Sequence, residues 1–275
     1  MGDYSAEIIS RIDRNYIADL LAQGERIDGR AYDEFRPIEI EYDVVSAKAE
    51  GSALVRMGGT SVIAGVKVLL GEPYPDTPDE GVIMVTAEMP PLASPLFELG
   101  PPREDAIELA RVVDRGVRES ETVEVKKLCV EPGKVVQMVF CDVYALEFDG
   151  NLIDCASIAA NAALLTTEFP EHKWENGEAV PTGNKISVPL KNLAVEATVA
   201  KIEDHLIIDP VLKEEMVQDC RITMAVDEGE NFTAIQKGGG AGPMTLEQVD
   251  QAFGMALDGT RMIRELIRST AKERE

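Results

Sequence analysis

The chain has 275 residues and a formal net charge of −23, from 50 acidic against 27 basic side chains. Its apolar content of 45% suffices for one large folded domain or two small ones, so we expect a folded chain and not an intrinsically disordered one. An acidic surface of this kind repels nucleic acids in general, so an RNA partner would require a local basic stripe or a neighbouring subunit. Solubility alone is the simpler interpretation of the charge.

The cysteines predict a protein of a reducing compartment. They lie in apolar runs without C-x-x-C spacing, which favours buried thiols over disulfides. The start of the chain lacks the basic and apolar regions of a signal peptide, and no run of about 18 apolar residues is long enough to span a membrane. We therefore predict a cytoplasmic protein without a membrane partner. The cysteines are Cys129, Cys141, Cys155 and Cys220.

Up to about residue 182, helical and strand-like patterns alternate with turns. A helix capped by Ser5 and stopped by Gly24 is predicted over residues 5–23. A charged turn around Asp28-Gly29 follows it. The further elements expected, in chain order, are a strand at 38–42, a hairpin over 52–70 that turns at Gly58-Gly59, a loop at 71–80, a strand at 82–88, a helix at 103–119, a strand at 135–146, a turn at 149–151 and an alanine-rich helix at 152–167.

The second part of the chain predicts a further sheet and a long terminal helix. Residues 169–182 are expected to form a loop that holds Trp174, and a helix over 245–270 opens with the capping box Thr245-x-x-Gln248. Strands are expected at 185–190, 194–201, 205–208, 221–226 and 231–236. These groups of elements predict an α+β fold of two packed lobes, with an N-terminal helix and charged turn at 1–30, a first lobe at 31–182 and a second at 183–275.

An acidic connection lies between the strands at 205–208 and 221–226. Asp209-Pro210 ends the first strand, because proline fixes φ and disfavours a helix at the residue before it. The connection carries Glu214, Glu215 and Asp219. It is either a site for general acid–base or metal chemistry or a solvated loop. Arg221 then places a permanent cation two residues after Asp219. A cation at this place is unexpected beside a pair of catalytic carboxylates, because it would hold them ionised.

The predicted helix at 103–119 carries an arginine stripe opposite its apolar face. Arg111, Arg115 and Arg118 gather there at about 100° per residue, in a chain that is otherwise acidic. Guanidinium groups fit phosphate oxygens, which suggests RNA binding. The alternative interpretation is a solvated face paired with acids at helical spacing, namely Glu108, Asp114 and Glu119.

Three further patterns point to no chemistry. The glycine run at 238–242 lies between a strand and a helix, but it lacks the G-K-[ST] ending of a phosphate loop and favours a flexible turn. His172 and His205 are isolated, without zinc-ligand spacing. No serine lies in a G-x-S-x-G context.

Six patterns in this order resemble the RNase PH-like subunits of the exosome. The resemblance covers nearly the whole chain and implies two α+β lobes, the first similar to ribosomal protein S5 domain 2, assembled in a hexameric ring. The patterns are Glu25-Arg26-Ile27-Asp28-Gly29-Arg30 with Arg36, Gly51-Ser52-Ala53 with Gly59-Thr60, the arginine helix, Asp149-Gly150-Asn151-Leu152-Ile153-Asp154, Leu206-Ile207-Ile208-Asp209-Pro210 and the glycine run.

The resemblance also implies where this chain departs from active members, which use inorganic phosphate to cut RNA from its 3′ end. Their two catalytic aspartates, six residues apart, fall on Glu215 and Arg221, so that a cation replaces an acid. The loop at 71–80 carries acids where active relatives carry arginines facing the pore of the ring. Among archaeal exosome subunits, the chain therefore looks most like the catalytically silent member.

The resemblance predicts a non-catalytic subunit that forms three heterodimers with an active RNase PH-like partner, below a cap of RNA-binding subunits. Arg111 and Arg115 are predicted to hold single-stranded RNA, with Arg118 and Arg103 as further candidates. No metal or cofactor is expected in this chain; inorganic phosphate, and Mg²⁺ as a candidate ion, belong to the partner's site. The alternative is that the chain is itself an active phosphorolytic 3′–5′ exoribonuclease.

Overall fold

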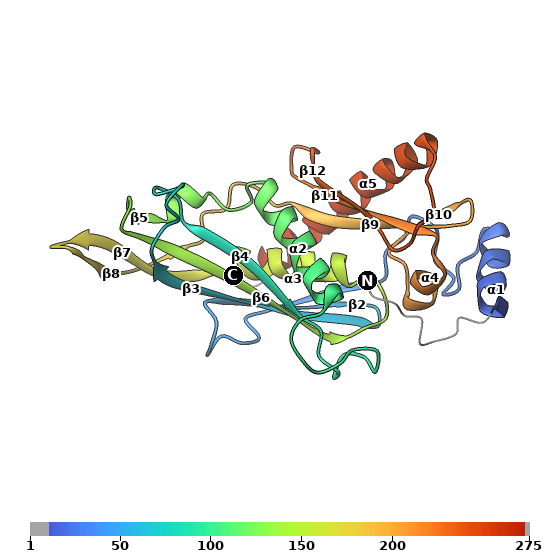
Figure 1. The fold of residues 1–275 in the computed structure, drawn as a ribbon, viewed down its shortest axis with the longest axis horizontal. Coiled ribbons are helices and arrows are strands. Elements are labelled where there is room, and N and C mark those ends of the chain that lie inside the picture. The colour runs from blue at the N-terminus through green and yellow to red at the C-terminus, as the bar shows by residue number, and fades with distance from the viewer. Residues whose placement is uncertain (1–10, 273–275) are drawn as a thin grey trace.

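Two sheets with helices between them form the framework of the computed structural model, which describes residues 11–272 (Figure 1). The first sheet has the order β1-β2-β3-β6-β4, with β5 paired to β6, and only β4 runs parallel to its neighbour. Its strands are β1 (Ile38–Tyr42), β2 (Gly51–Met57), β3 (Thr60–Gly71), β4 (Val82–Glu88), β5 (Cys129–Glu131) and β6 (Val135–Glu147). The predicted hairpin at 52–70 is confirmed, because Met57 pairs with Thr60 across Gly58-Gly59.

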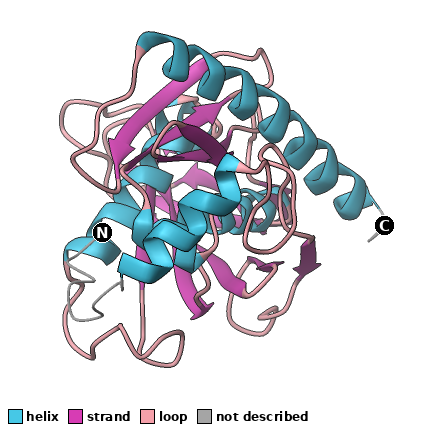
Figure 2. Cartoon of the chain, turned by 90° about the vertical axis from the view of Figure 1, so that its right-hand side faces the viewer, coloured by secondary structure: helices cyan, strands magenta, loops and turns pink. Residues whose placement is uncertain are grey.

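The second sheet has the order β10-β9-β11-β12 and is antiparallel throughout. Its strands are β9 (Val195–Ile202), β10 (His205–Ile208), β11 (Cys220–Val226) and β12 (Phe232–Gly238). The long helix α5 (Leu246–Lys272) packs against this sheet and ends at the C-terminal label in Figure 2. The predicted capping box at its start is present, with Gln248 N donating to Thr245 Oγ1 and Thr245 N to Gln248 Oε1.

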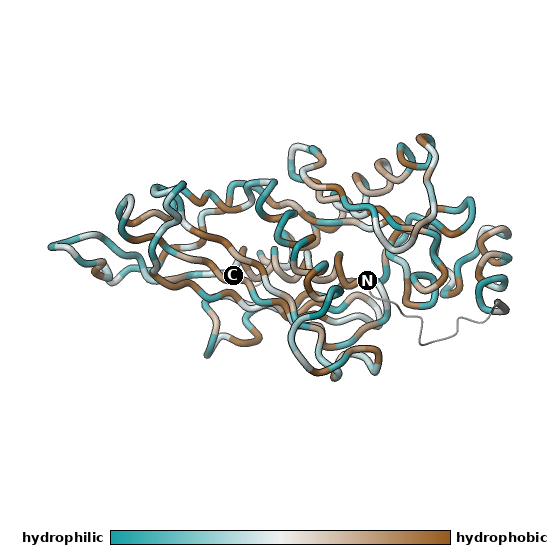
Figure 3. Tube along the Cα trace, viewed as in Figure 1, coloured by the Kyte–Doolittle hydropathy of each residue, from teal (hydrophilic) through white to brown (hydrophobic). Residues whose placement is uncertain are grey.

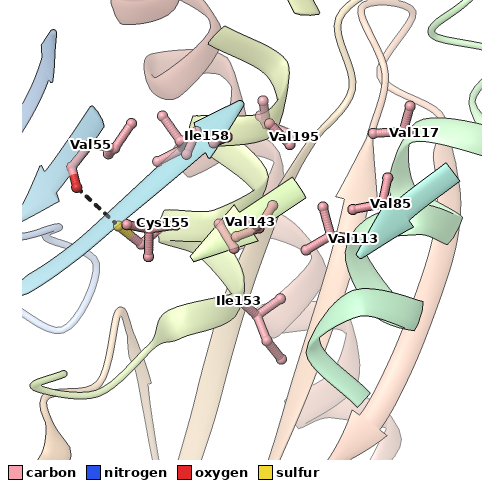
Figure 4. Close-up of a cluster of buried hydrophobic side chains, with 14 of the residues drawn as sticks. Val55, Val85, Val113, Val117, Val143, Ile153, Cys155, Ile158 and Val195 are labelled. Carbon is pink, nitrogen blue, oxygen red and sulfur yellow. Dashed lines mark hydrogen bonds between the residues drawn. The ribbon is translucent and has the colours of Figure 1, made fainter. Parts of the chain in front are cut away.

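Helices α2 (Glu104–Glu119) and α3 (Leu152–Leu165) lie between the sheets and contact strands of both. All residues of α3 from Leu152 to Leu164 are buried, since its many alanines allow close approach on every side. Side chains of α3, such as Cys155 and Ile158, share one apolar cluster with side chains of the first sheet and of β9 (Figure 4). The predicted α+β fold of two packed lobes is therefore confirmed.

The segment predicted to be a loop at 169–182, followed by a strand at 185–190, is instead a two-stranded hairpin of β7 (Glu168–Glu175) and β8 (Glu178–Ser187). The hairpin projects from the end of the first sheet, and its tip is hydrophilic (Figures 1 and 3). Most of its side chains are exposed, so no buried face imposes the apolar alternation by which strands are predicted. Trp174 is held there by Lys134 Nζ, 4.8 Å from the ring centroid.

Two smaller elements lie outside these layers. Helix α1 (Arg11–Ala22) is the described part of the helix predicted at 5–23, and the expected cap at Ser5 lies outside the described residues. A short 3-10 helix, η2 (Val125–Leu128), precedes β5. Within residues 11–272, no helix is long and apolar enough to cross a bilayer.

The cysteines are unbonded, as predicted, but not all of them are buried. Cys129 lies at the start of the short strand β5 and is only partly covered. Burial raises the pKa of the Cys141 thiol to about 12, so that thiol stays protonated and unreactive at neutral pH.

Candidate functional site

The connection between β10 and β11 is a short helix, α4 (Leu212–Val217), and not a plain turn. Glu214 and Glu215 face inward, with exposed fractions of 0% and 6%, so the alternative of a solvated acidic loop is wrong for both. The physical reason is that each glutamate finds a buried arginine partner. The two pairs have different consequences for function.

Glu214 forms a structural ion pair. Its Oε2 accepts from Arg26 Nη2 at 2.6 Å, and both side chains are completely buried. Arg26 also donates to the backbone carbonyls of Ile208 and Asp209, each at 2.9 Å. Because its hydrogen-bonding capacity is filled by this fork, Glu214 is an anchor for the N-terminal segment and not a proton carrier.

Asp209 is the centre of a second anchor. Its Oδ1 accepts from Arg36 Nη2 at 2.7 Å, and its Oδ2 accepts from Arg30 Nη1 at 2.9 Å. Burial by itself would raise the pKa of Asp209. The hydrogen bond and the charge of Arg36 lower this pKa by a larger amount, so the net shift is downward. The charged pattern at 25–30 together with Arg36 thus ties the start of the chain to the second lobe.

Glu215 and Arg221, the two positions predicted to replace catalytic aspartates, do come together. Arg221 Nη1 lies 3.7 Å from Glu215 Oε1, and Arg221 Nη2 lies 2.9 Å from Glu108 Oε1 on α2. Only 2% of the Arg221 side chain is exposed. A guanidinium therefore lies between two carboxylates, one from each lobe, at the place where a reacting pair of acids is expected.

The environment of Glu215 is that of a structural group. Burial raises the pKa of this carboxyl, and the charge of Arg221 opposes the rise. Its Oε2 accepts a hydrogen bond from Asn151 N at 3.0 Å, at the start of α3. We missed Glu108 as a member of this group, because helical spacing suggested that it pairs with the arginine stripe. Only the packing of α2 against β9 and β12, the two strands that flank β11, brings Arg221 to it.

Asp219, the third acid of the connection, belongs to another surface. It accepts from Arg14 Nη2 of α1 at 2.8 Å and lies 3.8 Å from Lys201 Nζ of β9. The glycine run packs against the backbone beside it: a Cβ on Gly240 would lie 2.3 Å from Asp219 O. Close packing and positive φ angles at Gly239 and Gly240 explain these glycines without a bound phosphate.

The predicted arginine stripe lines an open hollow of about 630 Å³ between α2 and β12. We call this hollow the arginine groove. Its lining comprises Glu108, Arg111, Val112, Asp114, Arg115, Arg118, Glu119 and Gln236. Three cations therefore share one surface in a chain of net charge −23.

The three arginines are held to different degrees. Arg118 pairs with Asp114 at 2.8 Å and donates to Ile83 O, as the solvated-face interpretation expects. Arg115 Nη2 donates to Gln236 Oε1 at 2.6 Å, which fixes its direction across the groove. Arg111 is exposed and forms no ion pair within the described residues. Arg111 and Arg115 thus keep donors for an external anion.

Arg103 lies apart from this groove. It is the residue before the first turn of α2, about 12 Å along the helix axis from Arg111 at 1.5 Å per residue. Its side chain is 71% exposed, and its guanidinium pairs with Glu98. Its predicted role in binding RNA stays a prediction, as do those of the three groove arginines.

Metal chemistry has no support in the described part of the chain, where no three His, Cys, Asp or Glu side chains gather to hold an ion. His172 Nδ1 hydrogen-bonds Gln137, and His205 contacts the ring of Tyr32 edge-on. In the predicted loop at 71–80, Asp79 and Glu80 lie near Lys126, at 3.9 and 3.8 Å.

The two lobes define a protein of the RNase PH class. Residues 34–170 match domain 1 of the 3′ exoribonuclease family, and residues 192–259 match domain 2. The chain belongs to this family. The lobe boundaries that we predicted, at 31–182 and 183–275, are not tested by these narrower matches.

The particular relatives are exosome subunits. The chain is 49% identical to exosome complex component Rrp42 of Thermococcus gammatolerans, over 95% of this chain and 96% of that protein. It is similar to a chain of the Archaeoglobus fulgidus exosome with RNA bound to the active site, at 45% identity and a TM-score of 0.86, over 94% of this chain and 99% of that chain. A chain of an archaeal exosome core matches at 41% identity and a TM-score of 0.84, over 96% of this chain and 99% of that chain. The predicted resemblance to archaeal exosome ring subunits is confirmed.

Proposed function

We propose that this chain is the non-catalytic ring subunit of an archaeal, phosphorolytic exosome. The observation that carries the proposal is the guanidinium of Arg221 between Glu215 and Glu108. Arginine stays protonated in proteins, so it neither accepts nor releases a proton during a reaction. Loss of one positioned acid or base costs roughly 10²–10⁴-fold in rate. Turnover would therefore belong to an active RNase PH-like partner.

The arginine groove supplies the contribution of this subunit to RNA binding. Arg111 and Arg115 would hold the RNA backbone beside the partner's active site, where inorganic phosphate and a candidate Mg²⁺ act. Backbone contacts of this kind carry no base information, so we expect no sequence preference from them. Three heterodimers would close the ring below a cap of RNA-binding subunits, in the cytoplasm.

The test uses the ring reconstituted from this chain and an active homologue. Arg111→Glu with Arg115→Glu is expected to weaken binding of single-stranded RNA at least tenfold and to slow phosphate-dependent release of nucleoside diphosphates. Between 50 and 200 mM salt, the logarithm of the RNA-binding constant falls linearly with the logarithm of the salt concentration. For the unaltered ring this slope should be steeper than for an Arg111→Gln, Arg115→Gln ring, by about 0.7 per lost phosphate contact.

The matched control is Arg261→Glu with Arg268→Glu, which makes the same charge change on α5. Both arginines are about half exposed and pair with acids of the β11–β12 turn. If both double variants assemble and degrade RNA like the unaltered ring, the groove does not bind RNA. A photoreactive RNA that crosslinks to α2 would further exclude a purely structural adaptor.

The second candidate function is that this chain is itself an active exoribonuclease. The acids available to it are Asp209, Glu214, Glu215 and Asp219. The first two are held in buried arginine pairs, which weighs against their movement during a reaction. The chain alone, with RNA, phosphate and Mg²⁺, should release no nucleoside diphosphate; sustained release would favour this alternative.

A further inference from the structure

A second hollow, of about 560 Å³, lies between residues 33–38 and one side of α5. We call it the β1–α5 groove. It shares no lining residue with the arginine groove, so an inference about it does not depend on the proposed function. Nothing in the reaction or the RNA binding proposed above uses this surface.

The wall on α5 is an apolar, adaptable stripe. Met255, Met262 and Leu266 recur at helical spacing and line the same side of the helix. Met262 is 41% exposed, which is high for a large apolar side chain on a helix that packs against a sheet. Unbranched methionine side chains fit a range of apolar shapes, so this wall is suited to receive side chains of another molecule.

The floor of the groove is closely packed. A Cβ on Gly259 would lie 2.7 Å from Phe35 Cε2, so only glycine allows the helix to approach Phe35 this closely. Phe35 itself is 8% exposed. The groove thus has a fixed base and a flexible wall.

The opposite wall leads into an open sheet edge. Within the described residues, β1 pairs only with β2, so one side of β1 has no strand partner. Ile38 at its start lines the groove with Leu266, and Tyr42 Oη at its end donates to Ile267 O at 3.0 Å. The strand therefore runs beside the C-terminal half of α5. An edge strand next to a helix is the arrangement in which extended peptides add to a sheet and insert alternate side chains.

The exposed charges along this groove and edge are acidic. Asp33, Glu34, Glu39 and Asp258 face solvent, whereas Arg36 is 6% exposed and bound to Asp209. The bordering cations are likewise occupied: Arg261 by Glu230 and Asp258, and Arg56 by Glu41.

We propose that the β1–α5 groove docks an extended, basic segment of a partner protein, which adds to the edge of β1 and inserts apolar side chains against Met255 and Met262. Charge complementarity favours this occupant, because RNA would meet acids of like charge. A second copy of this chain, with net charge −23, would bring acids against acids.

The probe is a fluorescein-labelled octapeptide that alternates lysine with valine, with a glutamate-for-lysine analogue as its counterpart. Anisotropy with the full chain should show at least tenfold tighter binding of the lysine peptide. Hydrogen exchange should show protection of β1 amides in its presence. Met262→Lys should weaken binding about tenfold, which corresponds to about 1.4 kcal/mol.

The matched control is Met84→Lys, on β4 at the other edge of the first sheet, where the methionine is 37% exposed. It should leave peptide affinity unchanged. Equal weakening by both variants, equal binding of both peptides, or no binding of the lysine peptide at millimolar concentration would overturn the proposal. So would displacement of the lysine peptide by single-stranded RNA or self-association lost only in Met262→Lys.

Discussion

Arg221 occupies a position that connects the two lobes through charge. Its guanidinium bridges Glu108 of α2 and Glu215 of α4, and all three side chains are at least partly withdrawn from water. A buried arrangement of this kind needs its cation, because the carboxylates would otherwise repel each other in a medium of low dielectric. Arg221, on which the proposed loss of catalysis rests, is thus also expected to stabilise the fold.

Replacing Arg221 by Met should therefore destabilise the protein by about 3–5 kcal/mol, the usual cost of leaving buried charge uncompensated. The measurement is urea unfolding at neutral pH. The control is Arg261→Met, which breaks a half-exposed pair with Glu230 and should cost under about 1 kcal/mol. Similar losses for both variants would contradict the structural role of Arg221.

At the scale of elements, the turn before α3 determines how the two lobes meet. Gly150 has φ +86°, and a Cβ there would lie 2.5 Å from Leu212 N at the start of α4. The same turn presents Asn151 N to Glu215 and the Gly150 carbonyl to Arg36. A small displacement of this turn would move both the Glu215–Arg221 pair and the Asp209 anchor.

Gly150→Ala should cost several kcal/mol, because it adds a backbone clash to the roughly 1–2 kcal/mol of a left-handed residue with a side chain. Gly177→Ala isolates the second contribution: Gly177 has φ +93° at the tip of the β7–β8 hairpin, with nothing within 4 Å of a Cβ. Thermal unfolding of both variants measures the difference. Equal shifts in Tm would mean that the turn at Gly150 moves to avoid the backbone clash at no further cost in stability.

At the scale of the whole molecule, two buried acids lie where the lobes meet. Burial raises the pKa of Glu196 on β9 to about 8 and that of Asp154 on α3 to about 7. Glu196 is 1% exposed and lies against Gly116 of α2, and its Oε2 has no hydrogen-bond partner among the described residues. The folded protein therefore holds protons there that the unfolded chain releases near pH 4–5.

This linkage predicts a stability that falls as pH rises. For Glu196, the stabilisation is complete below the unfolded pKa and is lost as pH rises to about 8, at up to roughly 1.4 kcal/mol per pH unit. Glu196→Gln should flatten the fall between pH 5 and 8, as measured by urea unfolding at each pH. As a control, Glu119→Gln changes an exposed acid and should leave the slope of unfolding free energy against pH unchanged. If Glu196→Gln also has the slope of the unaltered protein, Glu196 is ionised in the folded state.

The sequence by itself determined most elements and the two-lobed class, because apolar periodicity and turn residues act locally. The β2–β3 hairpin, the arginine face of α2 and the capping box of α5 follow from neighbours a few positions apart. The family resemblance also assigned Glu215 and Arg221 to the positions of the two aspartates, because that assignment needs only the order of residues along the chain. The β7–β8 hairpin escaped prediction because exposed strands bury no alternating face.

Only the tertiary structure decided which partners meet. Glu108 lies 113 positions before Arg221, and Glu214 lies 188 positions after Arg26, so no local pattern connects either pair. The same holds for the β1–α5 groove, whose walls come from opposite ends of the chain. Helix period and turn chemistry are properties of short segments, whereas ion pairing and groove shape depend on how distant segments pack.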